Sequence, residues 1–259
     1  MTSRSATIEV RGTITYIVDA SMRVEGASLD ILEIESTIQR FAIFAQLDRQ
    51  AIADVARSSK PRCILRGQAA FDQGEQANAI FLVLNGRFKA IQMDPDGSQI
   101  VTRLAGAGDL IGHLSAFNET PYPVTAVAIL DGEILAWGRR TFVDLLLRHP
   151  QLSLALIRYM GLSIEEAHKR LHEATNEHVE RRIAHAILRL VRQGGRPVEG
   201  GIEIPFPITR QDIGLMSGTT LQTVSRTLSA WQKNGIVDGG RQHLVLRDPH
   251  AIVAIAEEQ

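Results

Sequence analysis

The chain has 259 residues, with 28 Lys and Arg against 29 Asp and Glu, 44% hydrophobic residues and one cysteine. This length predicts one large domain or two ordinary ones, and the composition is that of a folded chain. One cysteine excludes an internal disulfide and the several thiolates of a zinc or iron–sulfur site within one chain. No apolar run approaches the roughly 18 residues of a membrane span, and no signal-peptide pattern opens the sequence. We therefore expect a cytoplasmic protein with no membrane partner.

The net charge of −1 argues at first against nucleic acid as a partner, but the charges are unevenly distributed. The part up to His178 has 18 basic and 21 acidic residues, and the part after it has 10 basic and 8 acidic. The C-terminal part is therefore mildly positive, which favours contact with phosphate there.

The first 34 residues show no sustained periodicity, and we expect a variable N-terminal extension over residues 1–34. Apolar residues at helical spacing then predict a helix over Ile31–Ser58.

Short β-rich runs alternate with turn dipeptides over residues 62–142, among them Asn85-Gly86 and Asp131-Gly132. Such dipeptides supply the positive φ of tight hairpins, so the pattern predicts an antiparallel meander. Closing the strands into a double-sheet roll removes exposed edges. We therefore predict a jelly-roll-like β-roll sensor domain with flanking helices over residues 35–149. The expected strands are Cys63–Leu65, Ala79–Leu84, Arg87–Met93, Ile100–Leu104, Thr125–Leu130 and Glu133–Trp137.

A helical heptad pattern follows over residues 150–178. A narrow apolar seam on so long a helix is typical of a two-stranded coiled coil, so we predict a dimerisation helix. Packing of this helix on its own domain is the alternative. The seam residues, at alternating steps of three and four, are Ile157, Met160, Ile164, Ala167, Leu171 and Ala174.

Residues 208–236, ITRQDIGLMSGTTLQTVSRTLSAWQKNGI, have the pattern of a helix-turn-helix motif. Thr209 and Thr220 are N-cap candidates for the two helices, and Gly218 supplies the turn between them. We expect the second helix to direct apolar side chains inward, namely Leu221, Val224, Leu228 and Trp231.

A hairpin signal at Gly239-Gly240, followed by His243–Leu246, predicts the wing of a winged-helix DNA-binding domain over residues 179–259. The first turns of a recognition helix contact bases in the major groove of double-stranded DNA. The expected DNA-binding residues are Thr209, Arg210, Gln211, Thr219, Thr220, Gln222, Ser225, Arg226 and Lys233.

These features resemble the cyclic-AMP receptor/fumarate-nitrate-reductase regulator (CRP/FNR) family of bacterial transcription factors. The resemblance covers about residues 35–250. It is carried by ITRQDIG followed by TVSRTLSAW, and by the glycine pattern of the roll: Gly67, Gly74-Glu75, Phe81–Gly86, Asp96-Gly97 and Gly108–Gly112.

The resemblance implies an α+β protein with a cyclic-nucleotide-binding-like roll, a dimerisation helix and a C-terminal winged helix. It implies an effector-responsive homodimer on a palindromic operator, with RNA polymerase as a further partner. TTLQTVSRTLSAW is similar to the branches that control denitrification in response to nitric oxide, or nitrogen fixation.

Cyclic-nucleotide-binding members of the family use a Gly-Glu-Leu turn and an Arg-Ser pair to hold the ribose and the cyclic phosphate. The candidate effector pocket of this chain has Gly112-His113-Leu114 and Pro123-Val124 at those places. A phosphate needs a guanidinium and a ribose hydroxyl a carboxylate, so we expect no cAMP binding.

Oxygen-sensing members carry a cysteine cluster for an iron–sulfur centre, which the lone Cys63 excludes. We predict Cys63 to be a small buried apolar residue, with a redox-active thiol as the alternative. Some members sense nitric oxide or carbon monoxide through a histidine-ligated haem. His113, His168 and His172 are the candidate haem ligands here, with ordinary surface histidines as the alternative, and no other metal site is expected.

Arg226 suits bidentate contact to guanine, and Gln222 stands where many relatives have Glu, which hints at a changed preference at one base pair. We expect a TTG-containing half-site, with two half-sites about 34 Å apart. The chain has no nucleophile–base pair, metal box or phosphate loop, so we expect no catalytic residues and no enzyme. The alternative function is a ligand-binding roll whose winged helix contacts protein instead of DNA.

Overall fold

The structure is a computed structural model that describes residues 6–10, 14–18, 30–95, 99–240 and 242–257. It divides into two compact units: the first contains the residues up to Lys89 and Ala105–Gly161, the second Ala90–Leu104 and the residues from Leu162 on. Strands β1 (Ala6–Val10) and β2 (Ile14–Val18) pair in antiparallel register within the predicted N-terminal extension. The predicted turn at Asp96-Gly97 lies outside the described residues.

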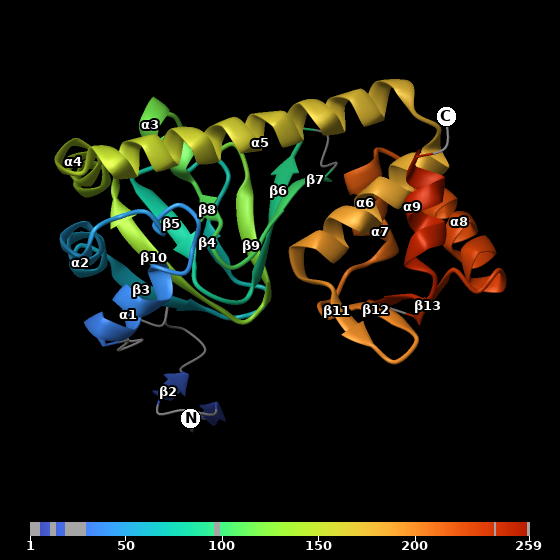
Figure 1. Cartoon of the computed structure of the whole chain (residues 1–259), viewed down its shortest axis with the longest axis horizontal. Coiled ribbons are helices and arrows are strands. Elements are labelled where there is room, and N and C mark those ends of the chain that lie inside the picture. The colour runs from blue at the N-terminus through green and yellow to red at the C-terminus, as the bar shows by residue number, and fades with distance from the viewer. Residues whose placement is uncertain (1–5, 11–13, 19–29, 96–98, 241, 258–259) are drawn as a thin grey trace. The chain divides into compact units, whose positions relative to one another are not determined.

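Two four-stranded sheets form the β-roll (Figure 1), with the strand orders β3-β10-β5-β8 and β4-β9-β6-β7. Each pair whose register is defined, such as β10 with β5, runs antiparallel, as the sequence predicts. The short strands β4 and β8 were not predicted. The strands of the roll are β3 (Lys60–Ile64), β4 (Ala69–Phe71), β5 (Ala79–Val83), β6 (Arg87–Met93), β7 (Gln99–Ala105), β8 (Leu110–Ile111), β9 (Thr125–Leu130) and β10 (Gly132–Gly138).

The turns at Asn85-Gly86 and Asp131-Gly132 carry the chain from one sheet to the other, so the prediction of hairpins between paired strands is wrong at these two places. Gly86 does adopt a positive φ of 79°. The two corners pack against each other, and a Cβ on Gly86 would lie 2.4 Å from the Cα of Gly132. The Asn85 amide donates to the Glu133 carboxylate at 2.6 Å and accepts from the Glu133 N–H at 3.0 Å.

Two helices replace the single helix predicted over Ile31–Ser58: α1 (Ile31–Ile38) and α2 (Arg49–Arg57). The carboxylate of Asp48 accepts from the Ala51 N–H at 2.8 Å and thereby begins α2 as an N-cap. The helical spacing misled because the turns between the helices also bury apolar residues, such as Phe44. Helices α3 (His113–Asn118) and α4 (Arg139–Arg148) complete this unit.

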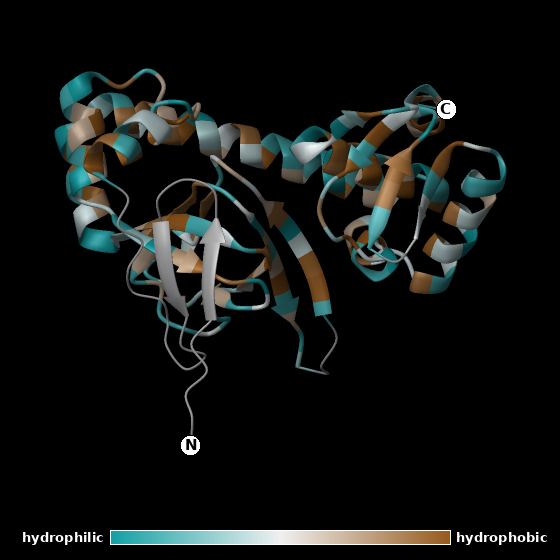
Figure 2. Cartoon of the chain, turned by 90° about the horizontal axis from the view of Figure 1, so that it is seen from below, coloured by the Kyte–Doolittle hydropathy of each residue, from teal (hydrophilic) through white to brown (hydrophobic). Residues whose placement is uncertain are grey.

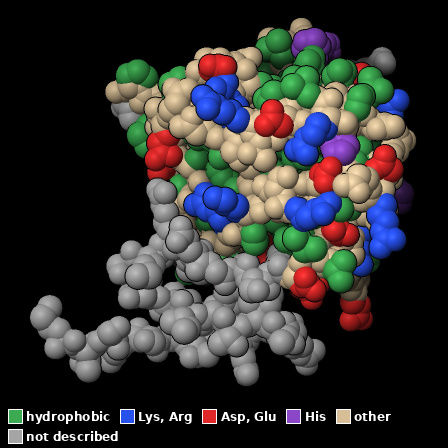
Figure 3. Space-filling model, turned by 90° about the vertical axis from the view of Figure 1, so that its left-hand side faces the viewer, with side chains coloured by type: hydrophobic (Ala, Val, Ile, Leu, Met, Phe, Trp, Pro, Cys, Tyr) green, Lys and Arg blue, Asp and Glu red, His purple; other side chains and the backbone are tan. Residues whose placement is uncertain are grey.

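A continuous apolar core fills the roll and reaches its helices. The Trp137 indole N–H donates to the Val55 carbonyl at 2.9 Å, which joins β10 to α2. Cys63 is half-buried in β3, less enclosed than predicted. Charges of both signs are interspersed on the face shown in Figure 3, as is usual for a surface in contact with water.

Helix α5 (Pro150–Asn176) corresponds to the predicted dimerisation helix and has 27 residues. Near its start Leu152 and Leu156 are buried in the core of the roll, and Tyr159 and Met160 pack against that core. The apolar face toward the roll therefore ends at about Met160.

The C-terminal domain is a winged helix-turn-helix, as predicted. Its sheet has the order β11-β12-β14-β13, and both hydrophobic and hydrophilic residues occur in its strands and helices (Figure 2). Strand β11 and helix α9 were not predicted. The elements are α6 (Val179–Gly194), β11 (Arg196–Val198), β12 (Gly201–Ile204), α7 (Arg210–Ser217), α8 (Leu221–Lys233), β13 (Val237–Gly240), β14 (His243–Leu246) and α9 (Pro249–Glu257). Within the described parts of the chain, no helix combines the length and apolarity needed to cross a bilayer.

Candidate nucleic-acid interface

Threonine caps begin both helices of the helix-turn-helix motif. The Thr209 hydroxyl accepts from the Asp212 N–H at 3.0 Å, while the Asp212 carboxylate accepts from the Thr209 N–H at 3.0 Å, which completes a capping box. The Thr220 hydroxyl accepts from the Thr223 N–H at 3.2 Å and begins α8. Both caps satisfy N–H groups that have no partner within the helix.

A tight corner at Gly218 joins α7 to α8. Gly218 ends α7 in the left-handed conformation, with φ of 62°, where an L side chain is strained. Gly214 lies against the turn so closely that a Cβ there would lie 2.9 Å from the Thr219 carbonyl oxygen. These two glycines set the angle between the helices.

The inner face of α8 buries Val224, Leu228 and Trp231. The indole N–H of Trp231 donates to the Glu180 carboxylate at 2.7 Å, which fastens α8 to the first turn of α6. Leu221 was expected to point inward as well, but it is 45% exposed. Leu221 occupies the first helical position, immediately after the N-cap, whereas the buried residues of α8 begin one turn later, at Val224.

We expect Trp231→Phe to lower the free energy of unfolding of this domain by about 1–3 kcal/mol, through lost indole volume and the lost hydrogen bond. Thermal unfolding followed by circular dichroism measures this loss. Glu180→Gln keeps an acceptor and is the control, with stability close to that of the wild type. An unchanged melting temperature for Trp231→Phe would show that the indole anchor does not stabilise α8.

The outer face of α8 forms a shallow hollow. Gln222, Arg226 and Lys233 are exposed there, and Ser225 is partly exposed. These side chains lie on one face because they recur at helical spacing. The hollow is lined by Leu221, Gln222, Ser225, Arg226, Ser229, Ala230 and Lys233.

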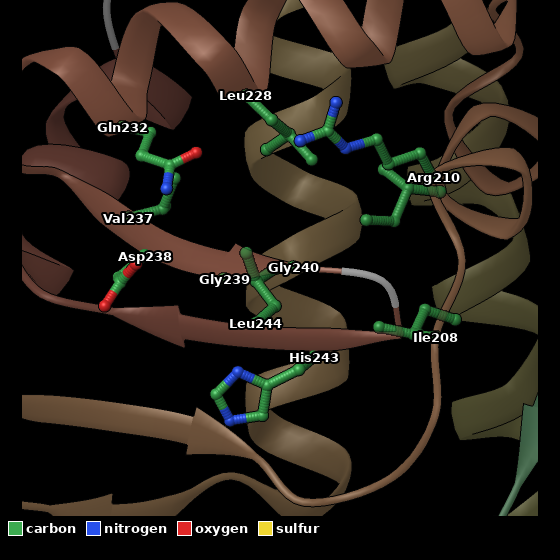
Figure 4. Close-up of a pocket in the computed structure, with 11 residues that line it drawn as sticks. Ile208, Arg210, Leu228, Gln232, Val237, Asp238, Gly239, Gly240, His243 and Leu244 are labelled. Carbon is green, nitrogen blue, oxygen red and sulfur yellow. The ribbon is translucent and has the colours of Figure 1, made fainter.

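The predicted residues of α7 and the turn differ in accessibility. Gln211 and Thr220 are exposed, and Thr219 is partly exposed. Arg210 lines a small pocket between α7, α8 and the β13–β14 hairpin, where its side chain lies beside Leu228 (Figure 4). Thr209 is half-buried in its capping box.

The wing is the β13–β14 hairpin, and charged pairs brace it. Arg247 lies 3.1 Å from the Asp238 carboxylate, and Arg196 and His243 lie 2.6 Å and 3.0 Å from the Glu203 carboxylate. The hydrogen bond from Arg196, with a further one from His243, lowers the pKa of Glu203. Hydrogen bonds from Arg247 and the backbone of Gly239 lower the pKa of Asp238. The carboxylates of Asp238 in β13 and Glu203 in β12 are thus held ionised and paired.

The five predicted effector-pocket residues differ in how far they are exposed to solvent. His113 is 5% exposed, whereas Leu114 is 52% exposed. Pro123 is exposed, and Gly112 and Val124 are half-buried. Gly112 adopts a φ of 76° immediately before α3, which explains a glycine there.

Sequence reasoning missed a buried arginine in the roll. Arg87, on β6, is 9% exposed and packs over Gly106, where a Cβ would lie 3.2 Å from its Nη1. Burial lowers the pKa of Arg87, and the nearby Asp109 carboxylate opposes this effect. Asp109 in turn lies 3.4 Å from the Tyr159 hydroxyl of α5. A single arginine in a strand gives no sequence signal that it faces inward.

The three candidate haem ligands differ in their surroundings. The buried His113 packs edge-on against Tyr159, with ring centroids 5.7 Å apart, so that the tyrosine occupies the space beside the imidazole. His168 and His172 are exposed on α5. Over the described residues, no three His, Cys, Asp or Glu side chains are grouped to hold a metal ion.

Comparison with known proteins assigns the β-roll and the C-terminal domain. Residues 61–149 match the cyclic nucleotide-binding domain, and residues 181–255 match the Crp-like helix-turn-helix domain. These matches define a DNA-binding transcription regulator with a cyclic-nucleotide-binding-type roll. The chain is 30% identical over 191 residues to the "Cyclic AMP receptor protein" of Thermus thermophilus. These matched residues cover 74% of this chain and 85% of that protein. The chain belongs to the CRP/FNR family of transcription regulators.

Two further proteins show the same similarity. The chain is 26% identical over 203 residues to the "Fumarate and nitrate reduction regulatory protein" of Salmonella typhimurium, covering 78% of this chain and 80% of that one. The solved structure of FixK2 from Bradyrhizobium japonicum has a TM-score of 0.68 at 22% identity, covers 78% of this chain and 98% of that one, and shows the shared fold.

Proposed function

We propose that the protein is an effector-responsive homodimer that binds a palindromic operator through α8 of each copy. The observation that carries this proposal is the outer face of α8, where Gln222, Ser225 and Arg226 are accessible on a helix braced from behind. A symmetric dimer presents two such helices to half-sites about one helical turn apart, ~34 Å.

The surface of α5 supports the dimer. Leu154, Ile157, Ile164 and Leu171 are 57%, 64%, 54% and 63% exposed. Together with Gly161 and His168 they recur at alternating steps of three and four, in a register that has Gly161 where the predicted seam has Met160. Of the predicted seam, Met160 instead packs against the core of the roll, while Ala167 and Ala174 are exposed. An apolar stripe of this kind is typical of a helix that pairs with a second copy.

A gel shift on a TTG-containing palindrome tests the proposal. We expect a single retarded complex of one dimer per palindrome, with no comparable complex on a scrambled duplex. Equal binding to both duplexes would instead favour the alternative, a regulatory module whose winged helix contacts protein. RNA polymerase, a further proposed partner, is tested by transcription in vitro from the same operator.

We also propose that the effector is not cAMP. By the resemblance to cyclic-nucleotide binders, the buried His113 takes the place of the carboxylate that holds the ribose. Pro123-Val124 takes the place of the Arg-Ser pair and provides no guanidinium. The buried Arg87 already has the Asp109 carboxylate near it, which opposes the effect of burial on its pKa.

Isothermal titration calorimetry with cAMP should show no saturable heat at about 1 mM, the weak end of ligand affinities. Micromolar affinity that is lost in His113→Ala would overturn this prediction. Arg66→Ala, at an exposed turn of the roll, is the control for non-specific loss.

A further inference from the structure

Buried ionisable side chains gather where the last turns of α5 meet α6, apart from the DNA-contacting face. Glu173 and Arg189 are 4% and 6% exposed. The side chains of Glu177 and His185 are 10% and 13% exposed. Charged side chains are buried to this extent almost only when they are paired.

Each carboxylate of this cluster has one arginine partner. Arg189 donates to Oε2 of Glu173, and Arg181 lies 3.5 Å from Oε1 of Glu177. The second oxygen of each carboxylate faces His185: Nδ1 is 3.8 Å from Glu173 Oε1, and Nε2 is 3.2 Å from Glu177 Oε2. Both of these oxygens are buried, and neither forms a hydrogen bond within the described chain, to His185 or to any other group.

The chemistry of imidazole decides which form fits this geometry. Neutral imidazole has one N–H donor and one acceptor nitrogen, and an acceptor that faces a carboxylate oxygen is repelled. The imidazolium form has a donor toward each oxygen, and its positive charge attracts both carboxylates. A positive charge on the His185 ring would therefore strengthen the attraction between α6 and the end of α5, which carries Glu173.

Three arginines also lie near the cluster. Arg181 and Arg189 lie one turn before and after His185 on α6. Arg170 of α5 interacts electrostatically with Arg189 and Glu173, and burial lowers the pKa of Arg170. In the described chain, no ion pair joins His185 to α7, α9 or β12, the other elements that pack on α6. The carboxylates of Glu173 and Glu177 are thus the anions that lie against the His185 ring.

The cluster bridges the break between the two helices. Glu173 belongs to α5, whereas His185 and Arg189 belong to α6. Arg182 adds a hydrogen bond from α6 to the Ala174 carbonyl at 3.0 Å. Since Glu180 of α6 also holds Trp231 of α8, the end of α5 is connected through α6 to the recognition helix.

We propose that Glu173, His185 and Arg189 are positioning residues for DNA binding, which fix the DNA-binding domain to the end of the dimer helix and hold it more firmly when His185 is protonated. This inference rests on the proposed function, because the orientation of the two domains matters only when a dimer binds two half-sites.

The test measures operator affinity of the full-length protein by fluorescence anisotropy between about pH 5 and pH 8, the range in which histidine changes charge. We expect wild-type affinity to fall about tenfold as pH rises, within the usual range of coupling between sites. His185→Gln should lose this pH dependence. His250→Gln, which changes an exposed histidine of α9, should keep it. A scrambled duplex corrects for pH effects common to all DNA binding.

A second set of variants tests the buried pair. Glu173→Gln should weaken operator binding about tenfold at constant dimer content. The exchange Glu173→Arg with Arg189→Glu should restore most of the lost affinity, whereas Glu165→Gln, on the exposed side of α5, should change nothing.

Equal pH profiles of operator affinity for the wild type and His185→Gln would overturn the inference. If Glu173→Gln fails to fold, this comparison of pH profiles is sufficient to test the inference. If the wild type binds the operator more tightly than scrambled DNA and the variants bind it with wild-type affinity, only the positioning role of Glu173, His185 and Arg189 is contradicted. A wild type without discrimination at any pH would contradict the proposed function itself.

Discussion

Arg226→Ala should abolish sequence-specific DNA binding while leaving the protein folded and dimeric. The guanidinium is exposed on the outer face of α8, so its removal disturbs no packing. A bidentate contact from arginine to guanine is worth about 1–3 kcal/mol of discrimination, and a symmetric dimer loses it in both half-sites. The affinity difference between operator and scrambled duplex should therefore collapse.

Footprinting on the operator measures this effect. Arg192→Ala is the matched control, because it removes an exposed arginine of the same domain from α6. It should retain the wild-type footprint. A footprint of Arg226→Ala with unchanged sequence selectivity would count against α8 as the helix that contacts bases.

Ile164→Lys should convert the protein to a monomer and weaken operator binding by about 100-fold to 10,000-fold, the range by which a second linked contact raises affinity. The side chain is 54% exposed in the single chain, so a lysine there should change the stability of the monomer little. In a paired seam the same lysine would be buried against the partner helix, which is costly.

Sedimentation velocity and gel shifts check the two parts of this prediction. Glu165→Lys changes the neighbouring residue, which is also exposed on α5, and should leave the dimer intact. A dimeric Ile164→Lys variant would place the dimer contact elsewhere.

Local signals in the sequence predicted the parts of the fold that local chemistry determines. Thr209, Thr220 and Gly218 predicted the helix-turn-helix, since caps and a left-handed turn residue act within a few residues. The heptad spacing predicted α5, and the glycine-rich turns predicted a roll of antiparallel strands.

The errors arose where tertiary contacts decide. Asn85-Gly86 has the signature of a hairpin, but its positive φ serves a corner between sheets, packed on Gly132. The buried apolar turns around Phe44 imitated one continuous helix. The deeply buried Arg87, and the contacts among Glu173, His185 and Arg189, depend on residues that come together only in the folded chain. No spacing rule in the sequence indicates them.

The most direct test of the central claim is a footprint of the wild-type protein on a TTG-containing palindrome, combined with the stoichiometry of the complex. We predict one dimer that protects two half-sites about one helical turn apart, ~34 Å. Protection of a single half-site by a monomer, or the absence of any preference over a scrambled duplex, would contradict it.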